Sequence, residues 1–383
     1  MKPFSLPAGW GIKPFGQCIK KVKYTEKQPT KSFLPEGKFP IVSQEKELIS
    51  GYSNNQNAVF SVKSPVVIFG DHTKVVKYID FDFVIGADGV KILQPIEEIN
   101  AKYFYYYLIH LHLRDLGYAR HYKLLKECVV FYPPLSEQKR IVEKLDKIFA
   151  AIDKAKSKTE KSLQNAKDVF SSYLNNIFNH SAYNWEEKTL GEVCDIYIGK
   201  TPARSNISYW DKNKETNNIW LSIADLLNTT NKQVFSSKEF LSNKGASLVP
   251  IVEPGTLLLS FKLTIGRVAF AGVPLRTNEA IAQLPIQDSQ ILDKNYLYYY
   301  LQYYDYEQLL RGDVKVKGKT LNKEKLKNLT VQYPSLPEQK RIVEKLDILQ
   351  SKTQELEKIY TQKLADLEEL KQSVLQQAFN GKL

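Results

Sequence analysis

The feature that most constrains this chain is an internal repeat of about 47 residues. The stretch PPLSEQKRIVEKLD, residues 133–146, recurs as PSLPEQKRIVEKLD, residues 334–347, and ten consecutive residues are identical. The offset of 201 residues continues without a gap, so that Phe178-Asn179 matches Phe379-Asn380. A repeat of this length predicts two copies of one structural unit in the chain.

Each copy is expected to form a long helix. Proline ends any preceding helical turn, and Ser136, or Ser335 with Glu338 three residues later, can cap the new helix. Apolar residues then recur at alternate steps of four and three, which is typical of a coiled coil. These positions are Ile141, Leu145, Ile148, Ile152, Ala155, Thr159, Ser162, Ala166, Val169 and Tyr173 in the first copy, and Ile342, Leu346, Leu349, Thr353, Leu356, Tyr360, Lys363, Leu367, Leu370 and Val374 in the second.

Two matched stripes in one chain most simply bury each other, although each could also pack on its own globular domain. At ~1.5 Å per residue the helices are rods of ~65 Å. Polar residues such as Thr159 and Lys363 interrupt the predicted seam. That weakness either leaves room for a further protein partner or is simply tolerated.

The segments before the helices are loosely repeated as well. Tyr103–Leu108 resembles Tyr296–Leu301, and Trp10 with Phe15-Gly16 resembles Trp185 with Leu190-Gly191. Each segment has short strand-like runs and one helical stretch, which predicts the α+β class. The predicted strands are Val66–Phe69, Lys74–Ile79, Leu257–Phe261 and Arg267–Phe270, and the predicted helices are Lys102–Leu116 and Lys294–Leu310. The expected parts are globules at 1–132 and 180–333 and long helices at 133–179 and 334–383.

The charge of the chain favours a polyanionic partner such as nucleic acid. Lys and Arg outnumber Asp and Glu by 54 to 42, which gives a net charge of +12. The surplus lies mainly in the globules, so we expect the contact there and a spacer role for the helices. No run approaches the ~20 apolar residues that span a bilayer, and no signal peptide is recognisable, which predicts a cytoplasmic protein without a membrane partner.

The sequence lacks recognisable catalytic or metal-binding motifs. Cys18, Cys128 and Cys194 are far apart, which indicates neither a disulfide framework nor a zinc site. Gly199-Lys-Thr201 lacks the glycine that a phosphate-binding loop has five residues earlier, where this chain has Cys194. In the stretch Gly312 to Thr320, five residues separate the two glycines instead of four. The Pro-Asp carboxylate motif of nucleases does not occur. The Asp/Asn-Pro-Pro-Tyr/Phe motif of amino-methyltransferases does not occur either. We therefore expect no catalytic residue, no metal site and no cofactor in this chain.

The repeated motifs resemble the specificity (S) subunits of type I restriction–modification systems over essentially the whole chain. The resemblance is carried by the doubled helix starts, residues 375–383, the Trp-x4-Phe/Leu-Gly openings and Gly199–Pro202. In the first globule, Val67–Thr73 and Gly86–Gly89 resemble one variety of the family's target recognition domain. The resemblance implies two such domains, each contacting one half of a split double-stranded DNA target about a helical turn apart, and an antiparallel coiled coil that sets the spacing.

The resemblance also implies protein partners. Two methyltransferase (modification) subunits would dock on the chain and bind S-adenosylmethionine, and ATP-dependent restriction subunits, with ATP and Mg²⁺, would be added for cleavage. The alternative is an architectural coiled-coil protein that joins two protein-binding modules without DNA recognition. A free-standing nuclease or methyltransferase with unfamiliar motifs is the enzyme alternative.

Candidate DNA contacts follow from residue chemistry, because Lys and Arg bind phosphates and polar side chains in nearby loops contact bases. For the first globule we predict His72, Lys74, Lys77, Arg120, His121, Tyr122 and Lys123. For the second we predict Lys200, Arg204, Lys262, Arg267, Arg276, Asn278, Lys315, Lys317 and Lys319.

Overall fold

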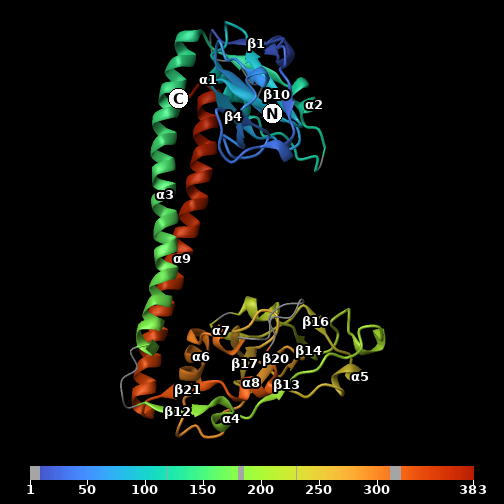
Figure 1. Cartoon of the computed structure of the whole chain (residues 1–383), viewed down its shortest axis with the longest axis vertical. Coiled ribbons are helices and arrows are strands. Elements are labelled where there is room, and N and C mark those ends of the chain that lie inside the picture. The colour runs from blue at the N-terminus through green and yellow to red at the C-terminus, as the bar shows by residue number, and fades with distance from the viewer. Residues whose placement is uncertain (1–8, 118, 180–184, 230, 311–320) are drawn as a thin grey trace. The chain divides into compact units, whose positions relative to one another are not determined.

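The computed structural model describes residues 9–117, 119–179, 185–229, 231–310 and 321–383 (Figure 1). The chain divides into two compact units. Residues 1–162 and 360–383 form the first unit, and residues 163–359 form the second. Each unit contains one β-rich globule and part of both long helices. None of the helices in the described part of the chain carries an apolar stretch long enough to cross a bilayer.

The first globule is built from three small sheets. Strands β2, β10, β7 and β8 form one sheet, β3, β9, β4 and β5 form the second, with β6 also on β9, and β1 pairs with β11. The strands are β1 Gly11–Pro14, β2 Ile19–Lys20, β3 Lys27–Gln28, β4 Phe39–Val42, β5 Gly51–Ser53, β6 Val59–Phe60, β7 Val66–Gly70, β8 Val76–Ile79, β9 Phe83–Gly86, β10 Val90–Pro95 and β11 Val129–Tyr132, and the helices are α1 Ala101–His110 and α2 Tyr122–Lys126.

The second globule repeats this α+β plan with longer loops. A five-stranded sheet has the order β13-β20-β17-β18-β15, a three-stranded sheet has β16-β14-β19, and β12 pairs with β21. The strands are β12 Glu186–Thr189, β13 Tyr197–Ile198, β14 Ile219–Leu221, β15 Gln233–Val234, β16 Glu239–Phe240, β17 Leu257–Ser260, β18 Val268–Ala271, β19 Arg276–Thr277, β20 Ile281–Leu284 and β21 Thr330–Tyr333, and the helices are α4 Leu190–Val193, α5 Asn243–Ala246, α6 Lys294–Tyr303, α7 Glu307–Leu310 and α8 Lys323–Lys327.

The predicted long helices are confirmed as α3, Leu135–Asn179, and α9, Leu336–Phe379, which lie side by side (Figure 1). In the first unit the start of α3 shares a core with the end of α9, where Leu145 and Phe149 join Leu375 and Phe379. In the second unit the end of α3 shares a core with the start of α9. The two helices are therefore packed antiparallel.

The seam between the helices is less continuous than the sequence predicts. Thr159 and Thr353 are buried, as their seam positions require, whereas Val169 and Leu370 remain 49% and 48% exposed. A straight helix has 3.6 residues per turn and drifts away from a strict 3.5-residue stripe. Part of the apolar stripe on each helix therefore faces away from the partner helix.

Identical glutamines fasten each long helix to its globule. The Gln138 side chain donates to the carbonyl oxygens of Glu98 and Pro133, both at 2.8 Å, and accepts from the Asn100 amide at 2.7 Å. Gln339 makes the equivalent three bonds in the second unit, each at 2.8 Å. Both glutamines are completely buried. The glutamine of the repeated Glu-Gln-Lys-Arg motif therefore has a structural role in both copies.

A tyrosine–carboxylate contact repeats in the same way. The Tyr106 hydroxyl of α1 donates to Asp146 of α3, and the Tyr299 hydroxyl of α6 donates to Asp347 of α9. The tyrosine clusters are core residues, because Tyr103, Tyr107, Tyr296 and Tyr299 are almost completely buried. The helices that carry them are shorter than predicted. The predicted Lys102–Leu116 helix ends at His110, because Leu111 is extended. The predicted Lys294–Leu310 helix is broken after Tyr303, because Tyr304 has a ψ of 129° and leaves the helical conformation.

Candidate nucleic-acid interface

The first globule has an open cavity of about 510 Å³ whose lining is mostly polar. Four basic side chains reach it from different elements, together with three carboxylates. The basic residues are Lys27, His72, Lys91 and Arg120, and the acidic residues are Glu45, Asp71 and Asp88. A cavity with this mixture of donors and acceptors suits a polar, anionic ligand more than an apolar one.

Two sequence motifs of the first globule meet at this cavity. The β7–β8 turn follows Gly70, and residues 87–89 connect β9 to β10. The Asp71 amide donates to the Gly89 carbonyl at 2.7 Å, which joins the two segments directly. Gly89 has a φ of 77°, which favours glycine, and a β-carbon there would lie 2.5 Å from the end of the Gln44 side chain, which would have to move.

Asp71 also fixes the segment that carries Arg120. Its carboxylate accepts from the Tyr122 amide at 2.8 Å and lies 3.7 Å from the Lys91 ammonium. The Asp71 carbonyl accepts from the His121 amide at 2.7 Å. Arg120 is therefore held at the mouth of the cavity by its neighbours in the chain, while its own side chain remains exposed.

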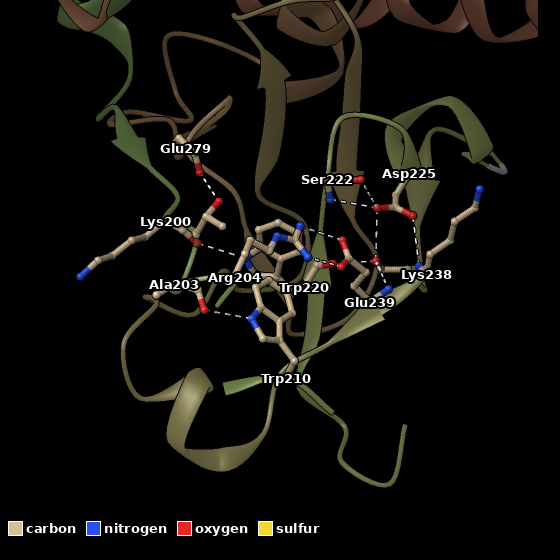
Figure 2. Close-up of polar contacts among 12 residues, drawn as sticks. Lys200, Ala203, Arg204, Trp210, Trp220, Ser222, Asp225, Lys238, Glu239 and Glu279 are labelled. Carbon is tan, nitrogen blue, oxygen red and sulfur yellow. Dashed lines mark hydrogen bonds and ion pairs between the residues drawn. The ribbon is translucent and has the colours of Figure 1, made fainter. Parts of the chain in front are cut away.

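In the second globule, the loop after β13 is held rigidly and presents two cations (Figure 2). The indole nitrogen of Trp220 donates to the Lys200 carbonyl at 3.0 Å, and that of Trp210 donates to the Ala203 carbonyl at 3.3 Å. The backbone packs so closely that a β-carbon at Gly199 would lie 2.1 Å from the Thr277 carbonyl oxygen. The side chains of Lys200 and Arg204 stay exposed on this fixed backbone.

Arg204 lies against two tryptophans whose rings are nearly perpendicular to each other (Figure 2). Its guanidinium carbon is 4.0 Å from the Trp210 ring centre and 4.7 Å from the Trp220 ring centre. Both terminal nitrogens donate to the Glu239 carboxylate. The hydrogen bond that Arg204 donates to Glu239 raises the pKa of Arg204 above its ordinary value, so the guanidinium stays charged. A cavity of about 370 Å³ opens beside this group, lined also by Ile207, Asp211, Lys212, Lys238 and Phe240.

Comparison with known proteins identifies the chain. The family described as "Type I restriction modification DNA specificity domain" matches residues 7–164 and 183–368, which together make up most of the sequence. The chain belongs to the type I restriction–modification specificity (HsdS) subunits. It is a DNA specificity subunit of such a system, and it is a non-catalytic subunit. Members of this family carry no cofactor of their own.

Individual relatives agree with this identification. The Escherichia coli EcoR124I/EcoR124II specificity subunit is 27% identical over 362 residues, which cover 87% of this chain and 85% of that protein. The Escherichia coli EcoBI specificity subunit is 25% identical over 68% of this chain and 60% of its own length.

Two solved structures have the same fold. A chain from a study of "complex assembly and conformational transition of the type I R-M system" superimposes with a TM-score of 0.78 at 22% identity, covering 100% of both chains. The HsdS subunit from Thermoanaerobacter tengcongensis gives a TM-score of 0.55 at 22% identity, covering 100% of this chain and 99% of its own.

Three of the predicted contacts in this specificity subunit point into the protein. Lys77 is 4% exposed and donates to the Ser43 and Glu47 carbonyls, because β8 turns its side chain under the 43–47 segment. Burial lowers the pKa of Lys77 below its ordinary value. His121 is completely buried, and its ring lies 3.1 Å from the Asp71 carbonyl and 3.1 Å from the Leu116 amide. Arg276 donates to the Ala246 and Val249 carbonyls. These three side chains hold loops in place, and their contact with DNA stays a prediction.

The remaining predicted residues lie at or near the surface. Lys74 is partly exposed and pairs with Asp115 at 3.2 Å, while Tyr122 is half-buried between Lys91 and Lys126. Asn278 caps the following turn by accepting from the Ala280 amide. His72 is half-buried in the cavity lining, and Lys123 and Arg267 are exposed; Lys262 is partly exposed over the Phe261 ring. Lys315, Lys317 and Lys319 lie outside the described residues.

Several candidate contacts were missed by sequence reasoning. Lys27 and Lys91 line the first cavity from strands β3 and β10, which only the folded sheets bring together. Glu239 is likewise distant from Arg204 in the chain. Trp210 is closer in the chain but is separated from Arg204 by a turn. The chain has only four tryptophans, and the placement of Trp210 and Trp220 near the Gly199–Pro202 motif was the one available signal.

Proposed function

We propose that each globule of this specificity subunit contacts one half of a bipartite double-stranded DNA target. Residues 1–132 and 180–333 are then the first and second target recognition domains, and residues 133–179 and 334–383 are the spacer helices. One observation carries the proposal: both globules present exposed cations on braced loops beside an open cavity, and both are fastened to a long helix by the same glutamine and tyrosine–aspartate contacts.

The proposed contacts divide by chemistry into two groups. Exposed Lys and Arg outside the cavities supply phosphate contacts, which position the protein without selecting a sequence. Side chains that line the cavities or lie in other loops of the same globule supply base contacts. The phosphate group consists of Lys74, Lys123, Lys200, Lys262 and Arg267, and the base group consists of His72, Arg120, Tyr122, Arg204 and Asn278.

Two methyltransferase subunits are the proposed direct partners. The fold explains the buried members of the repeated motif, but four charged residues in each copy are exposed and also identical. These form two equivalent charged faces, made of Lys139, Arg140, Glu143 and Lys144 on α3 and of Lys340, Arg341, Glu344 and Lys345 on α9. Two identical surfaces suit two copies of one partner.

In the assembled complex the partners supply the chemistry. The methyltransferase subunits bind S-adenosylmethionine, and the restriction subunits use ATP and Mg²⁺ for translocation and cleavage. We therefore propose that the complex works in the cytoplasm, where it has access to DNA. The specificity subunit contributes the choice of sequence and the distance between the two half-sites.

Selection from a random DNA library tests the function directly. The purified chain is mixed with its methyltransferase partner, and bound DNA is sequenced after washing at moderate salt. We expect two short blocks of fixed sequence. The gap between them should have a fixed length but no preferred sequence. Absent or sequence-independent binding would contradict the proposal and favour an architectural linker, and methyl transfer by the chain alone would favour an enzyme.

A further inference from the structure

The Arg204–Glu239 pair is accessible as well as ordered. The Arg204 side chain is 53% exposed and the Glu239 side chain 37% exposed, so both can reach a ligand without a change of fold. The guanidinium lies against both tryptophan rings, which are nearly perpendicular to each other, and its two terminal nitrogens bond to Glu239, so its position is defined from three sides. A side chain that is already ordered loses less conformational entropy when it binds. These properties are expected of a group that selects a ligand by shape.

The chemistry of the pair matches the edge of one base pair. In the major groove, Arg donates to O6 and N7 of guanine, and Glu accepts from N4 of cytosine. Arg204 and Glu239 place these donors and this acceptor side by side. A phosphate would suit the guanidinium but would be repelled by the Glu239 carboxylate. Lys212 and Lys238, which line the adjoining cavity, are better placed for phosphate contacts.

We propose that Arg204 and Glu239 together recognise a G·C base pair in the half-site of the second globule. In the free protein, Glu239 occupies the bidentate donor face of Arg204. On the target, the two terminal nitrogens turn to guanine and the carboxylate accepts from cytosine, so that both charged groups keep hydrogen-bond partners. This inference rests on the proposed function, because it names a base pair within one of the two half-sites.

The test compares variants of the chain in complex with the methyltransferase partner. For Arg204→Ala we expect the selected motif to lose its preference at one G·C position, with discrimination falling roughly 5- to 150-fold. Every other position in both half-sites should be unchanged. Arg204→Lys keeps the charge but not the planar donor fork, so it should lose preference at the same position while the salt dependence of binding stays the same.

Glu239→Gln removes the carboxylate but keeps one acceptor oxygen. We expect tighter binding to all DNA, because Arg204 loses its resident counter-ion, together with weaker discrimination at the position that Arg204→Ala relaxes. Lys244→Ala is the matched control, since it removes an exposed cation over the Tyr209 ring of the same globule. That variant should leave every base preference intact. Thermal melting of each variant verifies that the fold is retained.

Three results would overturn the inference. The first is a wild-type motif with no G·C pair in either half-site. The second is an Arg204→Ala variant that keeps the wild-type preference at all positions. The third is full recovery of base preference and affinity by Arg204→Lys, which would make Arg204 a phosphate contact. In all three the bipartite motif itself persists, whereas loss of any motif from the wild-type complex would defeat the proposed function instead.

Discussion

At the scale of single residues, Gln138 and Gln339 show how a repeated side chain can be explained by the fold. Each forms hydrogen bonds with three backbone groups in the turn where a globule meets its helix. A buried amide or carbonyl without a hydrogen bond costs free energy, so these side chains are required for local order. They act on the recognition surface only indirectly.

Replacing Gln138 by leucine should loosen the start of α1. Leucine has a similar size but leaves the Asn100 amide and two carbonyl oxygens unsatisfied, at a cost of about 2 kcal/mol. Hydrogen exchange at Asn100 should then be roughly 30-fold faster. Gln339→Leu should have the same effect at Asp293, and the exposed Gln164→Leu on α3 should change neither site. Unchanged exchange at Asn100 would show that Gln138 does not fasten this junction.

The placement of individual candidate side chains was harder to predict than the residue types involved. Lys77, His121 and Arg276 have suitable chemistry, but strand alternation and loop packing turn them inward. Lys27 and Lys91 come close only because β3 and β10 belong to sheets that meet at one cavity. A sequence without its sheet register does not specify which cations share a surface.

At the scale of elements, the two long helices were the most predictable part of the chain. Their start signals and apolar spacing depend on local sequence, and α3 and α9 begin within two residues of the repeated prolines. The antiparallel packing follows from the resemblance and is confirmed by the shared cores. The α+β class is also confirmed, whereas the boundaries of the recognition domains remain predictions.

The two charged faces on these helices give a prediction about the partner. Arg140→Glu or Arg341→Glu alone should reduce the methyltransferase content of the complex from two copies to one, because a reversed charge repels the docking surface. The double variant should bind none at concentrations where the wild type is saturated. Mass photometry measures the content, and Lys154→Glu, an exposed site on α3, is the control. Two bound copies in the double variant would rule out these faces as the docking sites.

At the scale of the whole molecule, the repeated unit explains why one chain would contact a target in two parts. Each globule has its own core and its own fastened helix, so the two can diverge in sequence preference without disturbing each other. The helices are shared by both units, which makes their length a common property of the molecule. In this account the globules determine the half-sites and the helices determine the gap.

Sequencing of DNA methylation in cells that carry this chain and its partners tests that division of roles most directly. The comparison is between the wild type and a variant that lacks residues 156–162 and 360–366, one heptad from each helix. Seven residues correspond to ~10 Å of helix, or ~3 base pairs. We predict a bipartite methylated motif whose gap shortens in the variant while both half-sites stay the same. A single continuous motif, or a gap that does not respond to the deletion, would contradict the account.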